Sequence, residues 1–106
     1  MFARTVFMKL KPNTLSEFLK TMENEIAPLL WKEEGFQDEM TLSDPGGREV
    51  VAVSFWDRKE NAQAYHLSGY PEVLKVLDKF LDGTPHLGTF EVVSSTLQKL
   101  AARATA

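Results

Sequence analysis

The sequence contains no cysteine, no run of basic residues and no long apolar segment. Without cysteine, disulfide bonds, thiolate metal ligands and a thiolate nucleophile are all excluded. A chain with a net charge of -3 and no lysine- or arginine-rich stretch lacks the basic surface that binds nucleic-acid phosphates. No stretch has the length of a membrane span, and the first residues alternate instead of forming the apolar block of a signal peptide. We therefore expect a cytoplasmic protein with neither a nucleic-acid nor a membrane partner.

The residues that are present are typical of a folded globular chain. Of the 106 residues, 43% are hydrophobic and 25% are charged, a balance that favours one hydrophobic core over disorder. We expect a single domain at 1–97. The alanine-rich tail at 98–106 is expected to extend as a short helix or to fray.

Hydrophobic periodicity predicts four strands and two helical regions. The period of two that is typical of strands occurs at 2–11, 36–43, 48–56 and 89–97. Apolar residues recur at helical spacing between the first and second strands and again between the third and fourth. The stretch 48–56 is apolar on both faces, so we expect it to lie centrally in the sheet.

Local signals predict where the helices begin and bend. The stretches 14–17 and 57–60 each fit a capping box, in which the first and last side chains satisfy free backbone N–H groups. Pro28 predicts a kink or a restart of the first helix near Ala27. The stretch 68–71, Ser-Gly-Tyr-Pro, predicts an interruption of the second helical region.

The predicted order is strand, helix, strand, strand, helix, strand. This order is that of the ferredoxin-like split β-α-β fold of the α+β class, an antiparallel four-stranded sheet with the helices on one face. The other face of the sheet is too apolar to remain in water. We expect a second copy of the chain to cover it, which makes the protein a homodimer.

The stretch Phe55-Trp56-Asp57-Arg58-Lys59-Glu60-Asn61-Ala62, followed by His66, resembles the antibiotic-biosynthesis-monooxygenase-like proteins. Pro28-Leu29-Leu30 ahead of Gly35-Phe36 adds to the resemblance, which covers nearly the whole chain. The resemblance implies a dimeric α/β barrel. It also implies cofactor-free oxidation of aromatic compounds, although the family includes haem-degrading members as well.

The haem-degrading branch carries an asparagine, a tryptophan and a histidine at three positions where this sequence has Thr5, Tyr65 and Lys75. The resemblance therefore disfavours haem, and we expect no cofactor. His86 has no further metal ligands near it in the sequence, so we expect no metal site.

His66 and Tyr65 are the candidate catalytic residues. An imidazole titrates near neutral pH, so His66 could remove a phenolic proton, and Tyr65 could supply a pocket hydroxyl. Helical spacing places the two on neighbouring faces, so both cannot point inward. The alternative for each is a purely structural role without catalysis. Arg4 and Arg48 could meet an anionic group, although isolated arginines are usually solvated.

Other large side chains are candidates for the wall of a substrate pocket between sheet and helices. The commoner interpretation of such residues is an ordinary place in the core. They are Trp56, Phe7, Phe36, Met40, Tyr70 and Phe90.

Three functions are compatible with these residues. The first is a cofactor-independent monooxygenase that oxidises an electron-rich aromatic molecule. The alternatives are a non-catalytic module that binds a small aromatic ligand or has a regulatory role, and, with less support, a haem-degrading monooxygenase.

Overall fold

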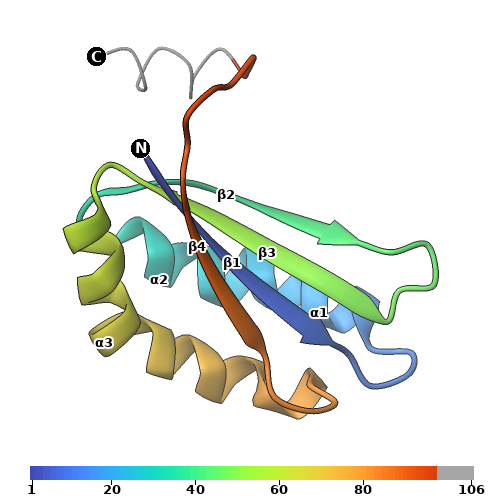
Figure 1. Cartoon of the computed structure of the whole chain (residues 1–106). Coiled ribbons are helices and arrows are strands. Elements are labelled where there is room, and N and C mark those ends of the chain that lie inside the picture. Colours follow the sequence, from blue (N-terminus) through green and yellow to red (C-terminus); the bar gives the residue numbers. More distant parts are fainter. Residues whose placement is uncertain (98–106) are drawn as a thin grey trace.

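The computed structural model describes residues 1–97, which form one antiparallel sheet covered by helices on one side (Figure 1). The strands are β1 (Phe2–Lys9), β2 (Phe36–Ser43), β3 (Glu49–Trp56) and β4 (His86–Glu91). The helices are α1 (Leu15–Thr21), α2 (Ala27–Trp31) and α3 (Lys59–Leu77). A π-helical turn, η1 (Met22–Ile26), joins α1 to α2, and a 3-10 turn, η2 (Asp78–Phe80), follows α3. The predicted tail at 98–106 lies outside the described residues.

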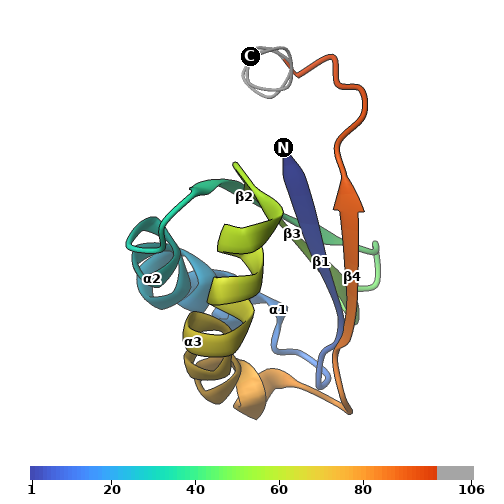
Figure 2. The ribbon, with the colours of Figure 1, turned by 60° about the vertical axis from the view of Figure 1, so that its left-hand side comes forward.

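The strands follow the order β2-β3-β1-β4, and every neighbouring pair is antiparallel. Figure 2 shows that the helices all lie on the same side of the sheet. The predicted ferredoxin-like α+β architecture is therefore confirmed, and β3 lies inside the sheet as expected. None of the helices within residues 1–97 is both long enough and apolar enough to cross a membrane.

The face of the sheet that carries the helices, here the inner face, holds the main hydrophobic core. Phe2, Val6 and Met8 of β1 point into it, in register with Trp56, Ala52 and Val50 of β3. The largest fully buried side chains are Trp56, Phe18, Leu10, Ile26 and Val50. Burying each such side chain contributes roughly 1.5–3 kcal/mol, so the packing of helices on this face is the main source of stability.

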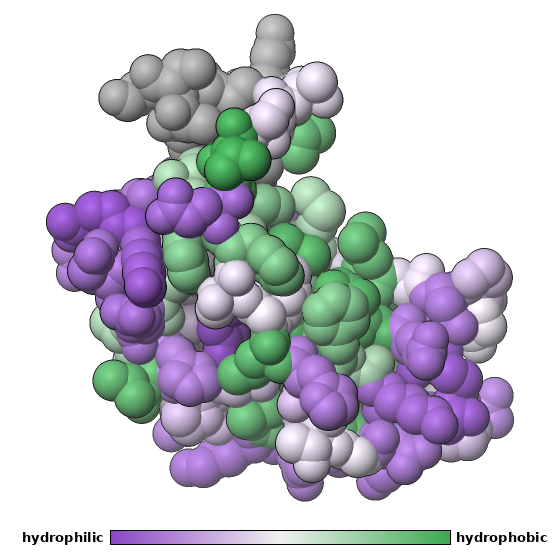
Figure 3. Space-filling model, viewed as in Figure 1, coloured by the Kyte–Doolittle hydropathy of each residue, from purple (hydrophilic) through white to green (hydrophobic). Residues whose placement is uncertain are grey.

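The opposite face of the sheet, here the open face, carries no helix and remains apolar. The register places Phe7, Val51 and Leu42 side by side across three strands, with Phe90 on β4. Phe7, Leu42 and Phe90 are about half exposed, at 48%, 52% and 57%. This side faces the viewer in Figure 3, where hydrophobic side chains gather over the strands between more hydrophilic regions.

The first helical region changes its hydrogen bonding ahead of Pro28. The π-helical turn ends at Ile26, and α2 begins at Ala27 with proline in its first turn. Proline lacks an N–H group, and a helix start is the position at which that donor is not needed. The helix does not stop and restart near Ala27, because Ile26 and Ala27 both keep helical backbone angles, and the bend expected there stays a prediction.

The predicted interruption of the second helical region is wrong. The helix α3 runs from Lys59 to Leu77 without a break, with Pro71 inside it. Pro71 lies on the exposed side of α3, where water can bond the carbonyl that proline leaves free. The buried side chains on both sides of it, including Tyr65 and Val73, pack on the same core and keep the two halves in line.

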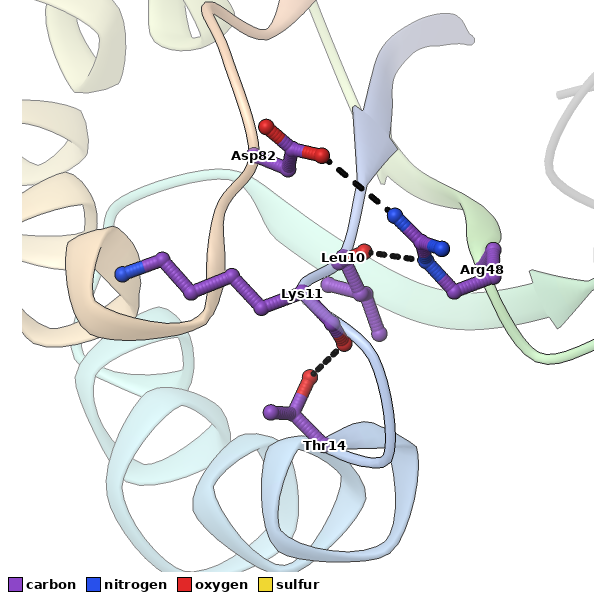
Figure 4. Close-up of polar contacts among 5 residues, drawn as sticks. All are labelled: Leu10, Lys11, Thr14, Arg48 and Asp82. Atoms are coloured by element: carbon purple, nitrogen blue, oxygen red, sulfur yellow. Dashed lines mark hydrogen bonds and ion pairs between the residues drawn. The ribbon is translucent and has the colours of Figure 1, made fainter.

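Neither predicted capping box forms. Thr14 precedes α1, but its hydroxyl donates to the carbonyl of Lys11 at 2.7 Å instead of capping the helix (Figure 4). At α3 the N-cap residue is Arg58, and the Asp57 carboxylate accepts a bond from Asn61 Nδ2 at 2.8 Å. Both side chains form local hydrogen bonds that replace the capping bond to a backbone N–H group.

Arg48 fastens the β2-β3 hairpin to the end of β1. Its Nε donates to the carbonyl of Leu10 at 2.7 Å, and its Nη2 pairs with Asp82 at 3.3 Å (Figure 4). Within the hairpin, Asp44 Oδ1 accepts bonds from the backbone N–H groups of Arg48 and Glu49, both at 3.0 Å. The predicted turn at 44–47 is confirmed.

The last strand lies earlier than predicted. It covers His86–Glu91 instead of 89–97, and it pairs with β1 from Phe7 back to Phe2. One more bond joins the N–H of Val92 to the carbonyl of Met1 at 3.0 Å. Because β1 begins at that point, residues 93–97 have no strand beside them to pair with.

Candidate functional site

A row of polar side chains crosses the inner face, one from each strand. Thr89 of β4 is in register with Arg4 of β1, Arg4 with Ser54 of β3, and Ser54 with Glu39 of β2. The row runs through a layer that is otherwise occupied by the core. Polar groups are costly to bury, so such a row requires partners or a function.

Arg4 is the most deeply buried charge of this row, with 3% of its surface exposed. Its Cζ lies 4.1 Å from the centroid of the Tyr70 ring and 5.1 Å from that of Tyr65. Its Nη2 donates to Nδ1 of His66 over 2.8 Å. A guanidinium cannot accept a hydrogen bond, so Nδ1 is unprotonated in this arrangement and the proton of a neutral His66 lies on Nε2.

The Arg4 guanidinium forms no ion pair with a carboxylate of residues 1–97. Burial lowers its pKa, and the two tyrosines oppose that effect. Glu39 stands in the same row, but burial raises its pKa, with a hydrogen bond from Thr41 working in the opposite direction. A close guanidinium would lower the pKa of a carboxyl group. The two charges therefore do not neutralise each other.

Both tyrosines beside Arg4 are held in their protonated form. Burial raises the pKa of Tyr65 far above its ordinary value, and Arg4 only partly opposes this. Burial also raises the pKa of Tyr70, again against the effect of Arg4. At neutral pH these hydroxyls can donate hydrogen bonds but cannot act as bases.

An aromatic stack supports the cluster from the core. Tyr65 stacks on Trp56 with centroids 4.9 Å apart and an interplanar angle of 28°. Trp56 is fully buried, and its Nε1 donates to Ser54 Oγ at 2.9 Å. Tyr70 stacks on His66 at 5.6 Å and 19°. Arg4 is thus held between two ring systems whose positions are fixed by packing.

Two cavities meet at Arg4. The inner one lies between helices and sheet, measures about 40 Å³, and is lined by Glu39, Tyr65 and Tyr70 among apolar residues. That volume holds little more than a water molecule. The outer one, here the edge pocket, lies between α3 and strands β1 and β4 and measures about 430 Å³. The edge pocket is lined by Phe2, Arg4, Lys59, Ala62, Gln63, His66, Leu67, Leu87 and Thr89.

The edge pocket is large enough for a small organic ligand, because such sites usually measure about 300–1,000 Å³. Its lining is mostly apolar, with Arg4 and His66 as the polar groups that contact each other. A flat ligand could lie on the apolar side chains and present one polar group to the guanidinium.

The residues proposed from the sequence do not all come together. His66, Tyr65 and Tyr70 gather round Arg4, and Tyr65 is buried while His66 is exposed, as their helical spacing predicted. Trp56 lines neither cavity and supports Tyr65 instead.

The remaining pocket candidates lie elsewhere. Phe36 packs edge-on against Trp56, with centroids 5.6 Å apart, and lines neither cavity. Phe7, Met40 and Phe90 lie on the open face, so the sheet separates them from the helices. The cause is their phase in the strands, since a shift of one residue moves a side chain to the other face.

Sequence patterns indicate Arg4 as a residue that could meet an anion but do not predict its burial, and they do not single out Glu39. Arg4 alternates in phase with Phe2, Val6 and Met8. A charged residue in phase with the apolar face of a strand is the signal that could have identified it. Glu39 has no such signal, because β2 contains a bulge between Phe36 and Asp38 that shifts its phase.

The three positions compared with haem-degrading enzymes are dispersed in the fold. Thr5 belongs to the open face, Tyr65 is in the core, and Lys75 is at the surface with Glu72 at 3.5 Å. These residues cannot hold one haem together. Among residues 1–97, no group of three or more histidine, aspartate or glutamate side chains is placed to bind a metal ion.

No protein-family model matches the sequence, and no curated protein matches it either. Similarity appears in the solved structures. A monooxygenase of Streptomyces coelicolor, in complex with nanaomycin D, aligns with a TM-score of 0.77 at 16% identity, over 91% of this chain and 90% of that one. A mutant of SnoaB, a cofactor-independent oxygenase of Streptomyces nogalater, aligns with a TM-score of 0.74 at 14% identity, over 91% and 96%.

A Bordetella bronchiseptica protein that carries the name antibiotic biosynthesis monooxygenase as a provisional assignment aligns with a TM-score of 0.76 at 12% identity. The alignment covers 88% of this chain and 97% of that one. The chain therefore has the fold of the antibiotic-biosynthesis-monooxygenase-like proteins, which confirms the fold that the sequence resemblance implied for a single chain, whereas the dimer stays a prediction. Identities this low establish the fold and leave the activity open.

Proposed function

We propose that this protein binds an electron-rich aromatic molecule in the edge pocket and oxidises it with molecular oxygen, without a cofactor. The observation that carries the proposal is the buried Arg4 guanidinium, which contacts His66 and two protonated tyrosines and opens on a cavity of about 430 Å³. The solved oxygenases of the same fold support this function.

The proposed reaction converts a CH₂ group beside a phenol ring into a carbonyl. A base removes a proton, and the resulting carbanion transfers one electron to O₂. The substrate radical and superoxide then combine to a peroxide, which loses water. The balance is CH₂ plus O₂ giving C=O plus H₂O, so oxygen is the only oxidant required.

The residues of the cluster have different roles in this proposal. Arg4 stabilises the negative oxygen of the deprotonated substrate, because a desolvated cation acts strongly at short range. His66 accepts the substrate proton at Nδ1, which becomes free when Arg4 turns its donor to the substrate. Tyr65 cannot be the base, since burial keeps it protonated, and it instead holds Arg4 in place.

Oxygen uptake tests the activity. Wild type supplied with 1,8-dihydroxyanthrone under air should consume oxygen and form the anthraquinone faster than the uncatalysed reaction. His66→Gln should reduce the rate by about 10²-fold or more, the usual contribution of a general base. His86→Gln is the matched control and should keep the wild-type rate, since His86 lies outside the edge pocket. No enzyme-dependent uptake, or full activity in the combined His66→Gln and Tyr65→Phe variant, contradicts the proposal.

A second candidate is a non-catalytic ligand-binding or regulatory module. One observation favours it. Nδ1 of His66 already accepts a hydrogen bond from Arg4, so the imidazole has no free basic nitrogen for a substrate proton in this arrangement. Mass spectrometry of small molecules that co-purify with the protein separates the two functions. Recovery of a bound aromatic that stays unchanged under air favours the module, and recovery of its oxidised product favours the enzyme.

We also propose that the protein is a homodimer joined through the open face. Phe7, Leu42 and Phe90 are about half exposed there, on a sheet side that no helix covers. A second copy would bury this surface against an identical one, which is the simplest symmetric arrangement.

Sedimentation tests the dimer. Wild type should sediment at twice the monomer mass of 12.0 kDa, and Phe7→Lys should sediment as a monomer. Leu19→Lys is the control, since Leu19 is 42% exposed on α1 and away from the open face. A monomeric wild type at micromolar concentration, or a dimeric Phe7→Lys, counts against this interface.

A further inference from the structure

The edge pocket contains a buried positive charge and no acidic residue. Only 3% of the surface of Arg4 is exposed, and its guanidinium has no carboxylate partner within residues 1–97. Lys59, at the start of α3, adds a second cation to the lining, and the lining contains neither aspartate nor glutamate. The chain as a whole has a net charge of -3, so the pocket has the opposite sign to the molecule.

A buried guanidinium is costly to keep unless an anion meets it. Removing the ion from water costs several kcal/mol, and the ring contacts and the hydrogen bond to neutral His66 offset most of that cost without supplying a counter-charge. Nδ1 of His66 occupies one of the five N–H groups of Arg4. The remaining donors can form the two parallel bonds that a carboxylate accepts from arginine.

The other surfaces of the edge pocket specify the remainder of the ligand. Phe2, Ala62, Leu67 and Leu87 provide apolar walls on both the helix and the strand side. A flat hydrocarbon body would cover these side chains while its charged end met Arg4.

We propose that the ligand of the edge pocket is an aromatic acid whose carboxylate binds Arg4, with Lys59 attracting the anion at the rim. This inference rests on the ligand pocket of the proposed function, and it adds the chemical class of the compound that binds there. It needs no turnover, so binding and oxidation can fail independently.

Calorimetric titration of two probes of equal shape tests the inference. The probes are 2-naphthoate, which is an anion, and 2-naphthamide, which is neutral. Wild type should bind the acid at least about tenfold more tightly than the amide, as expected for a desolvated arginine–carboxylate pair. Arg4→Gln should abolish this preference. Arg4→Lys should retain only part of it, because an ammonium cannot form the paired bonds.

Two lysine variants serve as matched charge controls. Lys59→Gln should weaken binding of the acid about two- to fivefold, as expected for an exposed charge. Lys20→Gln removes the same charge from the exposed side of α1 and should leave binding unchanged.

A measurement on the unmodified protein guards against an unfolded variant. In NMR spectra the acid should shift the Arg4 Nε–H signal and the His66 ring signals, and the amide should not. Equal affinities for acid and amide, no binding of the acid, or a preference that persists in Arg4→Gln would each overturn the inference. Acid binding without oxygen uptake would leave it standing and refute only the proposed reaction.

Discussion

Replacing Arg4 by methionine should remove ligand binding while changing stability very little. The side chain loses one hydrogen bond to His66, a charged bond worth about 1.5–3 kcal/mol. It also loses contacts with the rings of Tyr70 at 4.1 Å and Tyr65 at 5.1 Å, together worth about 2–3 kcal/mol. Against these losses stands the desolvation of the guanidinium, several kcal/mol that the variant no longer bears.

The terms nearly cancel, so the free energy of unfolding of Arg4→Met should lie within about 1.5 kcal/mol of wild type. His66 is exposed, and water can replace Arg4 at its Nδ1, so no polar group is stranded there. Methionine also fills most of the volume and packs well against aromatic rings. The measurement is urea unfolding followed by tryptophan fluorescence at one fixed protein concentration.

Met8→Ala sets the scale for a purely structural residue on the same face of β1. Met8 is 5% exposed, and its truncation should cost about 2–5 kcal/mol. If Arg4→Met costs as much as Met8→Ala, Arg4 holds the fold together, and the argument that its charge is kept for a ligand is refuted.

Three further substitutions test other features. Gly35 has φ of +82°, and a Cβ there would collide with Asp57 and Asn61. Gly35→Ala should therefore lower the free energy of unfolding by about 2 kcal/mol in urea titration. A variant as stable as wild type would contradict this expectation of strain. Burial raises the pKa of the Glu39 carboxyl group in the folded chain above its ordinary value in the unfolded chain. As pH rises, the unfolded chain therefore loses the Glu39 proton first, and Glu39 destabilises the fold at pH values above that ordinary pKa. Glu39→Gln should therefore raise the melting temperature at neutral pH, with a gain that disappears below that pKa, and a gain independent of pH would argue otherwise. Thr5 Oγ1 is buried without a hydrogen-bond partner in residues 1–97. Thr5→Val should therefore raise the free energy of unfolding by about 1 kcal/mol in the same urea titration. A lower free energy of unfolding would mean that a second copy in the dimer supplies a partner for this hydroxyl.

Much of the fold was predictable because its signals are local. Alternation along β1 separated its two faces, the apolar character of β3 on both faces placed it inside the sheet, and the turn at 44–47 identified the hairpin between β2 and β3. Predictions failed where packing outweighed a local preference. In α3 the continuous buried side of the helix overcame the preference of Pro71 to break it.

The site was less predictable than the fold. Its cluster joins Arg4 to His66, which is 62 residues away, so no short motif contains both. His66, Tyr65 and Tyr70 were among the candidates, but three of the other proposed pocket residues lie on the opposite face of the sheet.

The spacing of apolar residues along the chain was enough to establish the order of the elements and the type of fold, because both depend on local periodicity. The neighbours of the buried Arg4, two tyrosines and a histidine instead of a carboxylate, became known from the packing of segments that are distant in the chain. The reason is physical. Whether a charge is compensated depends on which distant side chains the packing brings within a few ångströms of it, and on how much water the same packing removes.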